Sequence, residues 1–172
     1  MPKTIKDYTL RITELERGLY EMENQVNFVL KISRAINNHA PERELFELFE
    51  DAMINEVQVN RMVFMIKEVN EWIRVSSLNA EQFKYDQFDQ LLQIYERPTV
   101  LNKKDLKLLD KFEYIIPIRI NEEPYACVLI GDVATQANFF HNFSFIISVA
   151  NLIVVALQNR QSVARKLERE RF

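Results

Sequence analysis

Apolar residues alternate spacings of three and four over the first 36 residues, and this repeat constrains the fold more than any other feature. The repeat fits the heptad register of a coiled coil, in which one face of a long helix meets a second helix. In this register Arg11 takes a g position and Glu16 the following e position, which is an attractive pair between parallel helices. The residues that set the register are Ile5, Tyr8, Ile12, Leu15, Leu19, Met22, Val26, Val29, Ser33 and Ile36.

Residues 1–24 are therefore predicted to form an N-terminal coiled-coil helix that pairs in parallel with a second copy of the chain. About 30 residues of helix extend about 45 Å, which is more than one small domain covers. A single amphipathic helix lying on its own domain is the alternative, and it is favoured beyond Val26, where Phe28 and Ile32 widen the apolar face. The predicted dimer interface on this helix consists of Ile5, Tyr8, Ile12, Leu15, Leu19, Met22 and Val26.

In the rest of the chain, the spacing of apolar residues is typical of helices in some segments and of strands in others. Met62–Ile66 is a continuous apolar run, typical of a strand buried on both faces, and Pro117 within a later run predicts a sheet edge or a bulge. Together the segments predict an α+β domain, with an antiparallel sheet, helices packed on one face and long helices at both ends. The expected helices are 42–57, 80–95, 103–111 and one that begins near Phe143, and the expected strands are 62–66, 72–76, 99–101, 114–120 and 125–130.

The composition argues against several functions. Twenty-two basic and 25 acidic residues give a net charge of −3, whereas proteins that bind nucleic acid are usually basic. A single cysteine, Cys127, excludes an internal disulfide, and together with only two histidines it argues against a zinc site. Two glycines leave no material for a Gly-rich phosphate loop. We predict no catalytic residue, no metal and no cofactor, and Cys127 is interpreted as a small buried hydrophobe.

Neither a leader nor a membrane span is expected. The N-terminus lacks the apolar segment of a signal peptide. The longest apolar stretch, Phe143 to Leu157, contains Ser144, Ser148 and Asn151, and it is shorter than the roughly 20 residues that cross a bilayer. The sequence thus predicts a cytoplasmic protein without a membrane partner.

Three stretches follow one another in a telling order, namely Asn27–Ile36 followed by Glu44–Leu48, the strand Arg61–Ile66, and Ile115–Ile118 through Val128–Ile130. Their order resembles a GAF domain, the small-molecule sensor module of many signalling proteins. The likeness covers Gln25 to Asn159, and a GAF-like domain is expected over 25–159. Ala126 stands where GAF domains often have a glycine, and no cyclic-nucleotide or bilin signature is present, so neither ligand is carried over.

The resemblance also implies a position for a ligand. Between Asn79 and Phe112 the pattern is irregular, and this segment is called the insert. Five side chains gather in the insert, where GAF relatives form the wall of their cavity, and aromatic groups with a polar tip suit a small organic ligand. Ordinary packing of the insert, with a filled cavity, is the alternative. The ligand-pocket candidates are Phe83, Tyr85, Phe88, Leu92 and Tyr95.

The C-terminal segment resembles a connecting helix. Ala156–Arg160 and Lys166–Arg171 are similar to the helix that joins a GAF domain to a bacterial metal-dependent serine phosphatase of the sigma-factor-regulating type. Histidine kinases and diguanylate cyclases use comparable helices. Residues 160–172 are thus expected to begin a helix that leads into an output domain of the same polypeptide. Ile153, Ala156 and Val163 are predicted to extend the dimer interface along it, and a helix that completes the core and then frays is the alternative.

These features predict a non-catalytic sensory and dimerisation module that regulates an attached output domain, with a serine phosphatase as the first choice. A structural coiled-coil adaptor without a ligand is the alternative from a different class. An autonomous hydrolase is disfavoured because the sequence contains no recognisable nucleophile or metal set.

Overall fold

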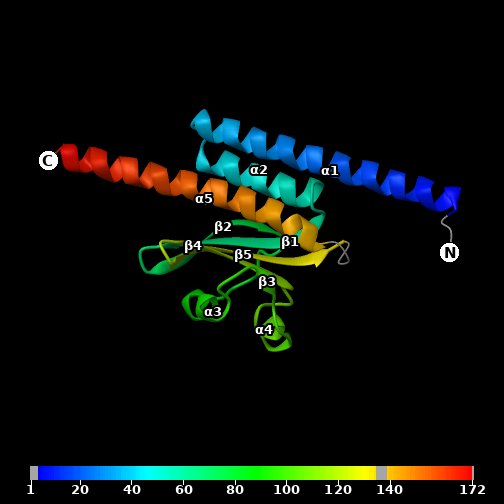
Figure 1. Cartoon of the computed structure of the whole chain (residues 1–172). Coiled ribbons are helices and arrows are strands. Elements are labelled where there is room, and N and C mark those ends of the chain that lie inside the picture. Colours follow the sequence, from blue (N-terminus) through cyan, green and yellow to red (C-terminus); the bar gives the residue numbers. More distant parts are fainter. Residues whose placement is uncertain (1–3, 135–138, 172) are drawn as a thin grey trace.

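The computed structural model describes residues 4–134 and 139–171 (Figure 1). Its centre is an antiparallel sheet of five strands in the order β2-β1-β5-β4-β3. Three helices, α1, α2 and α5, lie on one side of the sheet, and the short helices α3 and α4 lie on the other (Figure 1). The strands are β1 (Val59–Glu68), β2 (Glu71–Leu78), β3 (Thr99–Val100), β4 (Tyr114–Ile120) and β5 (Glu123–Val133). The helices are α1 (Ile5–Asn37), α2 (Glu42–Asn55), α3 (Phe88–Ile94), α4 (Lys103–Leu108) and α5 (Phe139–Glu170).

The strands separate two hydrophobic cores because successive side chains of a strand point to opposite faces. On β1, Met62, Phe64 and Ile66 enter the first core, which α1, α2 and α5 cover, whereas Val63 and Met65 enter the second core, on the side of α3 and α4. β5 alternates in the same way. The continuous apolar runs of the sequence therefore correspond to strands buried on both faces, as predicted, and the predicted α+β class is confirmed.

β4 also behaves as its proline predicts. β3 pairs only with Tyr114 and Ile115 of β4, so Pro117 has β5 on one side and no strand partner on the other. The β4–β5 register also shifts nearby, between Ile118 and Arg119. Such positions suit a residue that cannot donate a backbone hydrogen bond.

Part of the predicted helix over 80–95 is wrong. Residues 80–87 are irregular, and α3 begins only at Phe88. The guanidinium of Arg74 on β2 donates to the carbonyl oxygens of Ala80 (2.9 Å) and Glu81 (3.2 Å), which a helix would use for its own hydrogen bonds. The neighbouring α4 ends at Leu108 instead of continuing to residue 111, because Asp110 and Lys111 have positive φ (51° and 64°).

α1 and α5 run in the same direction and project from opposite ends of the domain (Figure 1). Where they meet, Gln25 Nε2 donates to Asn142 Oδ1 (2.9 Å), and the ring of Phe28 packs edge-on against Phe145. The first turn of α1 is fixed by a capping box between Thr4 and Asp7. From there to residue 23 every residue of α1 is exposed.

Candidate functional site

The predicted ligand-pocket residues lie under the insert, but most of them are core. Phe83, Phe88, Leu92 and Tyr95 are all buried, and only Tyr85 is partly exposed. They form one hydrophobic cluster with Leu109, Phe112 and the face of the sheet on the side of α3 and α4. The space between the sheet and α3 is thus largely occupied by the chain's own side chains.

The packing around Phe88 illustrates how this space is filled. The ring of Phe88 lies 5.3 Å from that of Trp72 and 5.0 Å from that of Tyr85, the latter at a near-perpendicular angle of 89°. Phe83 makes a similar edge-on contact with Phe112, at 5.1 Å. Aromatic pairs prefer these tilted and edge-on arrangements, so the cluster has the geometry of a stable core.

An open pocket of about 480 Å³ remains at the mouth of this cluster, beside the edge strand β2. Its lining combines aromatic surface with two cationic side chains, Arg74 and Lys84, and one acidic side chain, Asp86. Cations beside aromatic rings suit a small planar molecule that carries an acidic group. Burial, together with the negative charges of Asp105 and Asp86, raises the pKa of Tyr85 above its ordinary value. The lining residues are Met65, Trp72, Arg74, Phe83, Lys84, Tyr85 and Asp86.

Two of the five predicted pocket residues, Phe83 and Tyr85, line this open pocket. Trp72 and Arg74 could not be recognised from the sequence, because their alternating pattern on β2 is that of any half-buried strand. The spatial signal that identifies them is the pairing of β2 with β1, which places both side chains beside the insert.

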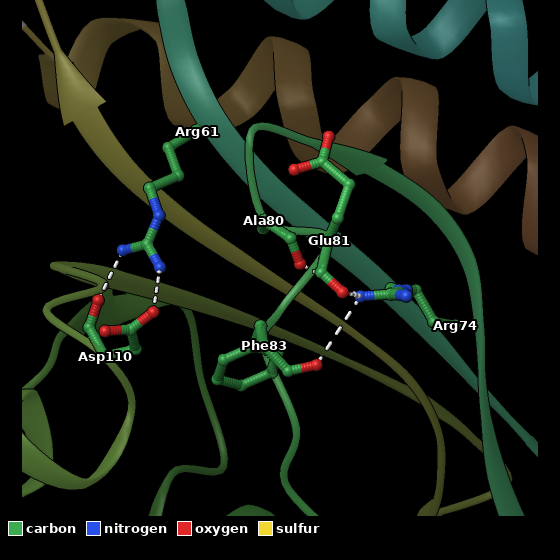
Figure 2. Close-up of polar contacts among 6 residues, drawn as sticks. All are labelled: Arg61, Arg74, Ala80, Glu81, Phe83 and Asp110. Atoms are coloured by element: carbon green, nitrogen blue, oxygen red, sulfur yellow. Dashed lines mark hydrogen bonds and ion pairs between the residues drawn. The ribbon is translucent and has the colours of Figure 1, made fainter.

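Three arginines on three different strands hold the insert against the sheet. Arg61 of β1 donates to the carbonyl and, at 2.5 Å, to the carboxylate of Asp110, and Arg74 of β2 donates to Ala80 and Glu81 (Figure 2). Arg119 of β4 donates to the carbonyl of Leu92. Each guanidinium reaches a backbone oxygen of the insert, so the insert is anchored along its whole length.

Arg74→Ala is expected to loosen the 80–87 segment without unfolding the domain. Hydrogen bonds of this kind contribute about 1 kcal/mol, so the amide exchange of this segment should accelerate roughly fivefold. Hydrogen-exchange mass spectrometry of the insert peptides measures this change. Arg43→Ala, which removes an exposed ion pair with Glu47 on α2, is the matched control and should leave the insert unchanged. Equal exchange in wild type and Arg74→Ala would contradict the anchoring role.

Asp89 provides a further, pH-dependent anchor for α3. Its carboxylate accepts hydrogen bonds from Lys67 Nζ (2.8 Å) and from the indole N–H of Trp72 (3.1 Å). The Lys67 bond, supported by that of Trp72, lowers the pKa of Asp89 below its ordinary value. Both partners lie on the β1–β2 hairpin, so ionised Asp89 ties α3 to this hairpin.

The lowered pKa predicts the direction of a pH effect. The folded state gains stability from ionised Asp89 above the unfolded pKa of about 3.9, and it loses this stability as the pH falls through the folded pKa. We expect the free energy of unfolding to decline less steeply in Asp89→Asn than in wild type when urea unfolding is compared between about pH 5 and pH 3. Parallel declines would show that the carboxylate does not contribute.

Cys127 is completely buried in the second core, as predicted for a small hydrophobe. Burial raises the pKa of its thiol far above the ordinary value, which suppresses the reactive thiolate. We expect thiol reagents to modify Cys127 only when the domain unfolds, at a rate that rises with added urea. Rapid stoichiometric labelling in native buffer would contradict this prediction.

The second candidate site is the predicted dimer interface on α1 and α5. Every predicted interface residue on α1 is exposed, from Ile5 at 85% to Val26 at 54%, so this stripe has no cover within the described part of the chain. Val163 on α5 is also exposed. Ile153 is corrected, because its side chain is completely buried in the first core. Ala156 is 7% exposed and lines an open groove between α1 and α5, so its place in a dimer interface stays a prediction.

α5 is the one helix in the described part of the chain that is long and apolar enough to cross a membrane by length and composition. Half of its apolar window is buried inside the domain. The core helix of a globular domain passes the same test, and the contacts of α5 with α1 and α2 give it that place here. Among the described residues, no group of three potential ligands is arranged to hold a metal ion.

Comparisons with known proteins identify the fold. No family model and no curated protein matches the chain. Among solved structures, it is similar to the GAF domain of a Pseudomonas syringae pv. tomato protein described as a sensor histidine kinase, with a TM-score of 0.67, 12% identity, and coverage of 90% of this chain and 99% of that one.

Two further structures agree. The GAF domain of the potassium sensor histidine kinase KdpD from Escherichia coli gives a TM-score of 0.59 at 13% identity, over 81% of this chain and 97% of that one. The nlh2 GAF domain of A. aeolicus in an inactive state gives 0.59 at 16% identity, over 81% and 99%. The chain therefore has the fold of GAF domains, as the resemblance of its sequence implied.

Proposed function

We propose that the chain is a non-catalytic sensory module that forms a parallel homodimer and regulates an attached output domain through α5. The observation that carries this proposal is the course of the two long helices. α1 and α5 run in the same direction and project from opposite ends of the domain (Figure 1). In a parallel dimer both α1 helices therefore approach from one end and both α5 helices leave together at the other.

The similar structures support the sensory part of the proposal. Two of them are GAF domains of proteins described as sensor histidine kinases. For the output domain we retain the serine phosphatase, because the resemblance of the α5 tail points there first, and a histidine kinase or a diguanylate cyclase is the alternative. A cytoplasmic location without nucleic-acid or membrane partners belongs to the same proposal, and the net charge of −3 supports the absence of a nucleic acid.

The transmission role is tested by inserting one to four alanines after Asn159 in a polypeptide that carries the output domain. Each inserted residue rotates the downstream helix by about 100°, so two residues should disturb output activity most and four should nearly restore it. Activity that follows this helical period supports transmission through α5. If every insertion leaves activity and its regulation unchanged, α5 is only a tether.

A small organic acid bound in the open pocket is the proposed signal, and a ligand-free adaptor is the second candidate. The filled space around Phe88 favours the adaptor, whereas the aromatic and cationic lining of the pocket favours a ligand. Trp72 is the only tryptophan of the chain and lines the pocket, so its fluorescence reports on occupancy. Titration with benzoate and phenylacetate distinguishes the two: a saturable change that Lys84→Ala weakens supports a sensor, and an unchanged signal supports the adaptor.

A further inference from the structure

A polar cleft of about 430 Å³ lies between α5 and the turn that joins β1 to β2. Ile66 pairs with Ala126, which places the tip of this hairpin beside Tyr125, and α5 passes over the same end of the sheet (Figure 1). The volume lies within the range of small-molecule sites, roughly 300–1,000 Å³. The polar lining includes Glu68, Tyr125, Gln158, Gln161, Ser162 and Arg165.

The polar groups of this cleft are not committed to other contacts. Within the described part of the chain, no hydrogen bond or ion pair engages the guanidinium of Arg165, the carboxylate of Glu68 or the hydroxyl of Tyr125. Lys67, the other cation of the lining, already donates to Asp89 of α3, on the opposite side of the sheet. Arg165 and Glu68 are therefore the charges that the cleft offers to a ligand.

The charges around the cleft have both signs. Burial raises the pKa of Tyr125, the carboxylates of Glu68 and Glu42 raise it further, and the guanidinium of Arg165 lowers it. All three charges thus act at one hydroxyl, although no ion pair joins Arg165 to either carboxylate among the described residues. An anion alone would meet the carboxylates here, and a cation alone would meet the guanidinium. A small molecule that carries both charges matches the cleft.

The cleft lies where α5 leaves the core. Leu157 is the last buried residue of α5 in the ranges that the structure describes. Gln158, Ser162 and Arg165 follow at spacings of four and three, so they lie on one face of the helix, which is turned toward the hairpin. Over these two turns, polar groups that can bind a ligand take the place of apolar contacts with the sheet.

We infer that this cleft binds a free α-amino acid, with its carboxylate on Arg165 and its ammonium group on Glu68. Charge-assisted hydrogen bonds of this kind are roughly twice as strong as neutral ones. The side-chain amides of Gln158 and Gln161 supply further donors and acceptors. Val69, which is 90% exposed and lines the same cleft, provides apolar surface for the side chain of the ligand.

The bound amino acid would connect α5 to the β1–β2 hairpin. Binding itself goes beyond the proposed function, because it requires neither a second copy of the chain nor an output domain. A regulatory effect of the amino acid, in contrast, rests on the proposed role of α5 in transmission. The ligand would then restrain α5 at the point where the helix leaves the domain.

Nuclear magnetic resonance titration of the full chain with L-alanine, L-valine and L-glutamine tests the site. Each amino acid should shift the amide resonances around Val69 and Ser162 saturably at millimolar concentration, and hydrogen exchange of residues 158–165 should slow. Propionate and ethylamine are the matched control ligands, since each carries only one of the two charges of alanine, and neither should reproduce the saturable shifts. If none of the three amino acids shifts these resonances, the inference is overturned.

Two variants test the assigned contacts. Arg165→Gln and Glu68→Gln should each weaken the binding of L-alanine by about tenfold, while circular dichroism shows a folded domain. Arg169→Gln and Glu71→Gln are the matched controls, because they remove the same charges from exposed positions outside the cleft and should leave the affinity unchanged.

Two results of these experiments would contradict the site. Shifts that centre on Trp72 and Tyr85 would place the amino acid in the open pocket beside β2, on the other side of the sheet. Binding that neither Arg165→Gln nor Glu68→Gln weakens would also overturn the inference. The insertions after Asn159 test transmission separately, so either proposal can fail while the other stands.

Discussion

Replacing Ile12 and Leu15 together by glutamate is expected to convert the dimer into folded monomers. The two side chains are 56% and 60% exposed within the chain, so the domain does not depend on them for its core. In the dimer each copy would lose two buried apolar side chains, worth about 1.5–3 kcal/mol each, and gain like charges across the interface. The dissociation constant should therefore rise at least about a thousandfold, which corresponds to about 4 kcal/mol.

Sedimentation equilibrium at micromolar concentration measures this change. The matched control carries glutamate at Thr13 and Arg17 instead. These residues occupy b and f positions of the same helix and face away from the predicted partner. The control should remain dimeric, and both variants should keep the thermal unfolding of the domain. Persistent dimers of the Ile12 and Leu15 variant would place the interface on another surface.

The second large effect concerns Phe88, at the centre of the space where a GAF ligand was expected. Phe88 is fully buried against Trp72 and Tyr85, so Phe88→Ala should destabilise the domain by about 3–5 kcal/mol through lost burial and the resulting cavity. Urea unfolding followed by Trp72 fluorescence measures this loss.

Tyr85→Phe provides the control for this prediction. It keeps the ring that packs edge-on against Phe88 and removes only the hydroxyl of a partly exposed side chain, so its effect should stay within about 1 kcal/mol. A loss below about 1 kcal/mol for Phe88→Ala itself would mean that the site is not stabilised by packing. In that case the space under α3 would be available to a ligand after all.

The sheet and the long helices could be predicted because their signals are local. Continuous apolar runs such as Met62–Ile66 report burial on both faces, and the heptad stripe reports an apolar helix face. The irregular stretch 80–87 could not be predicted from the same rules. Its sequence permits a helix, but Arg74, a residue of another element, takes two of its carbonyl groups. Tertiary contacts of this kind override local propensity.

The candidate sites also combine features that local sequence signals reveal with features that depend on tertiary contacts. Apolar periodicity identified the stripe of α1, yet it could not distinguish the buried Ile153 from the exposed Val155 two positions later. That distinction depends on how α5 is rotated against the sheet and α1, which only the folded arrangement determines. In the same way, the aromatic residues of the insert could be found from the sequence, but Trp72 and Arg74 beside them could not. They belong to β2, whose pairing with β1 brings them next to the insert.

The relative direction of the two copies is the most direct test of the proposed module. Spin labels at Arg17→Cys on α1 and Lys166→Cys on α5, each in its own sample, report the separation of equivalent sites by pulsed electron resonance. Both positions are exposed, and Cys127 is buried. A parallel dimer predicts separations below about 30 Å at both sites, since helices in contact are only about 10 Å thick. An antiparallel pairing centred on the stretch where α1 and α5 lie side by side, near Ser33 and Leu152, would place the Arg17 pair about 50 Å and the Lys166 pair about 40 Å apart and would contradict the proposal.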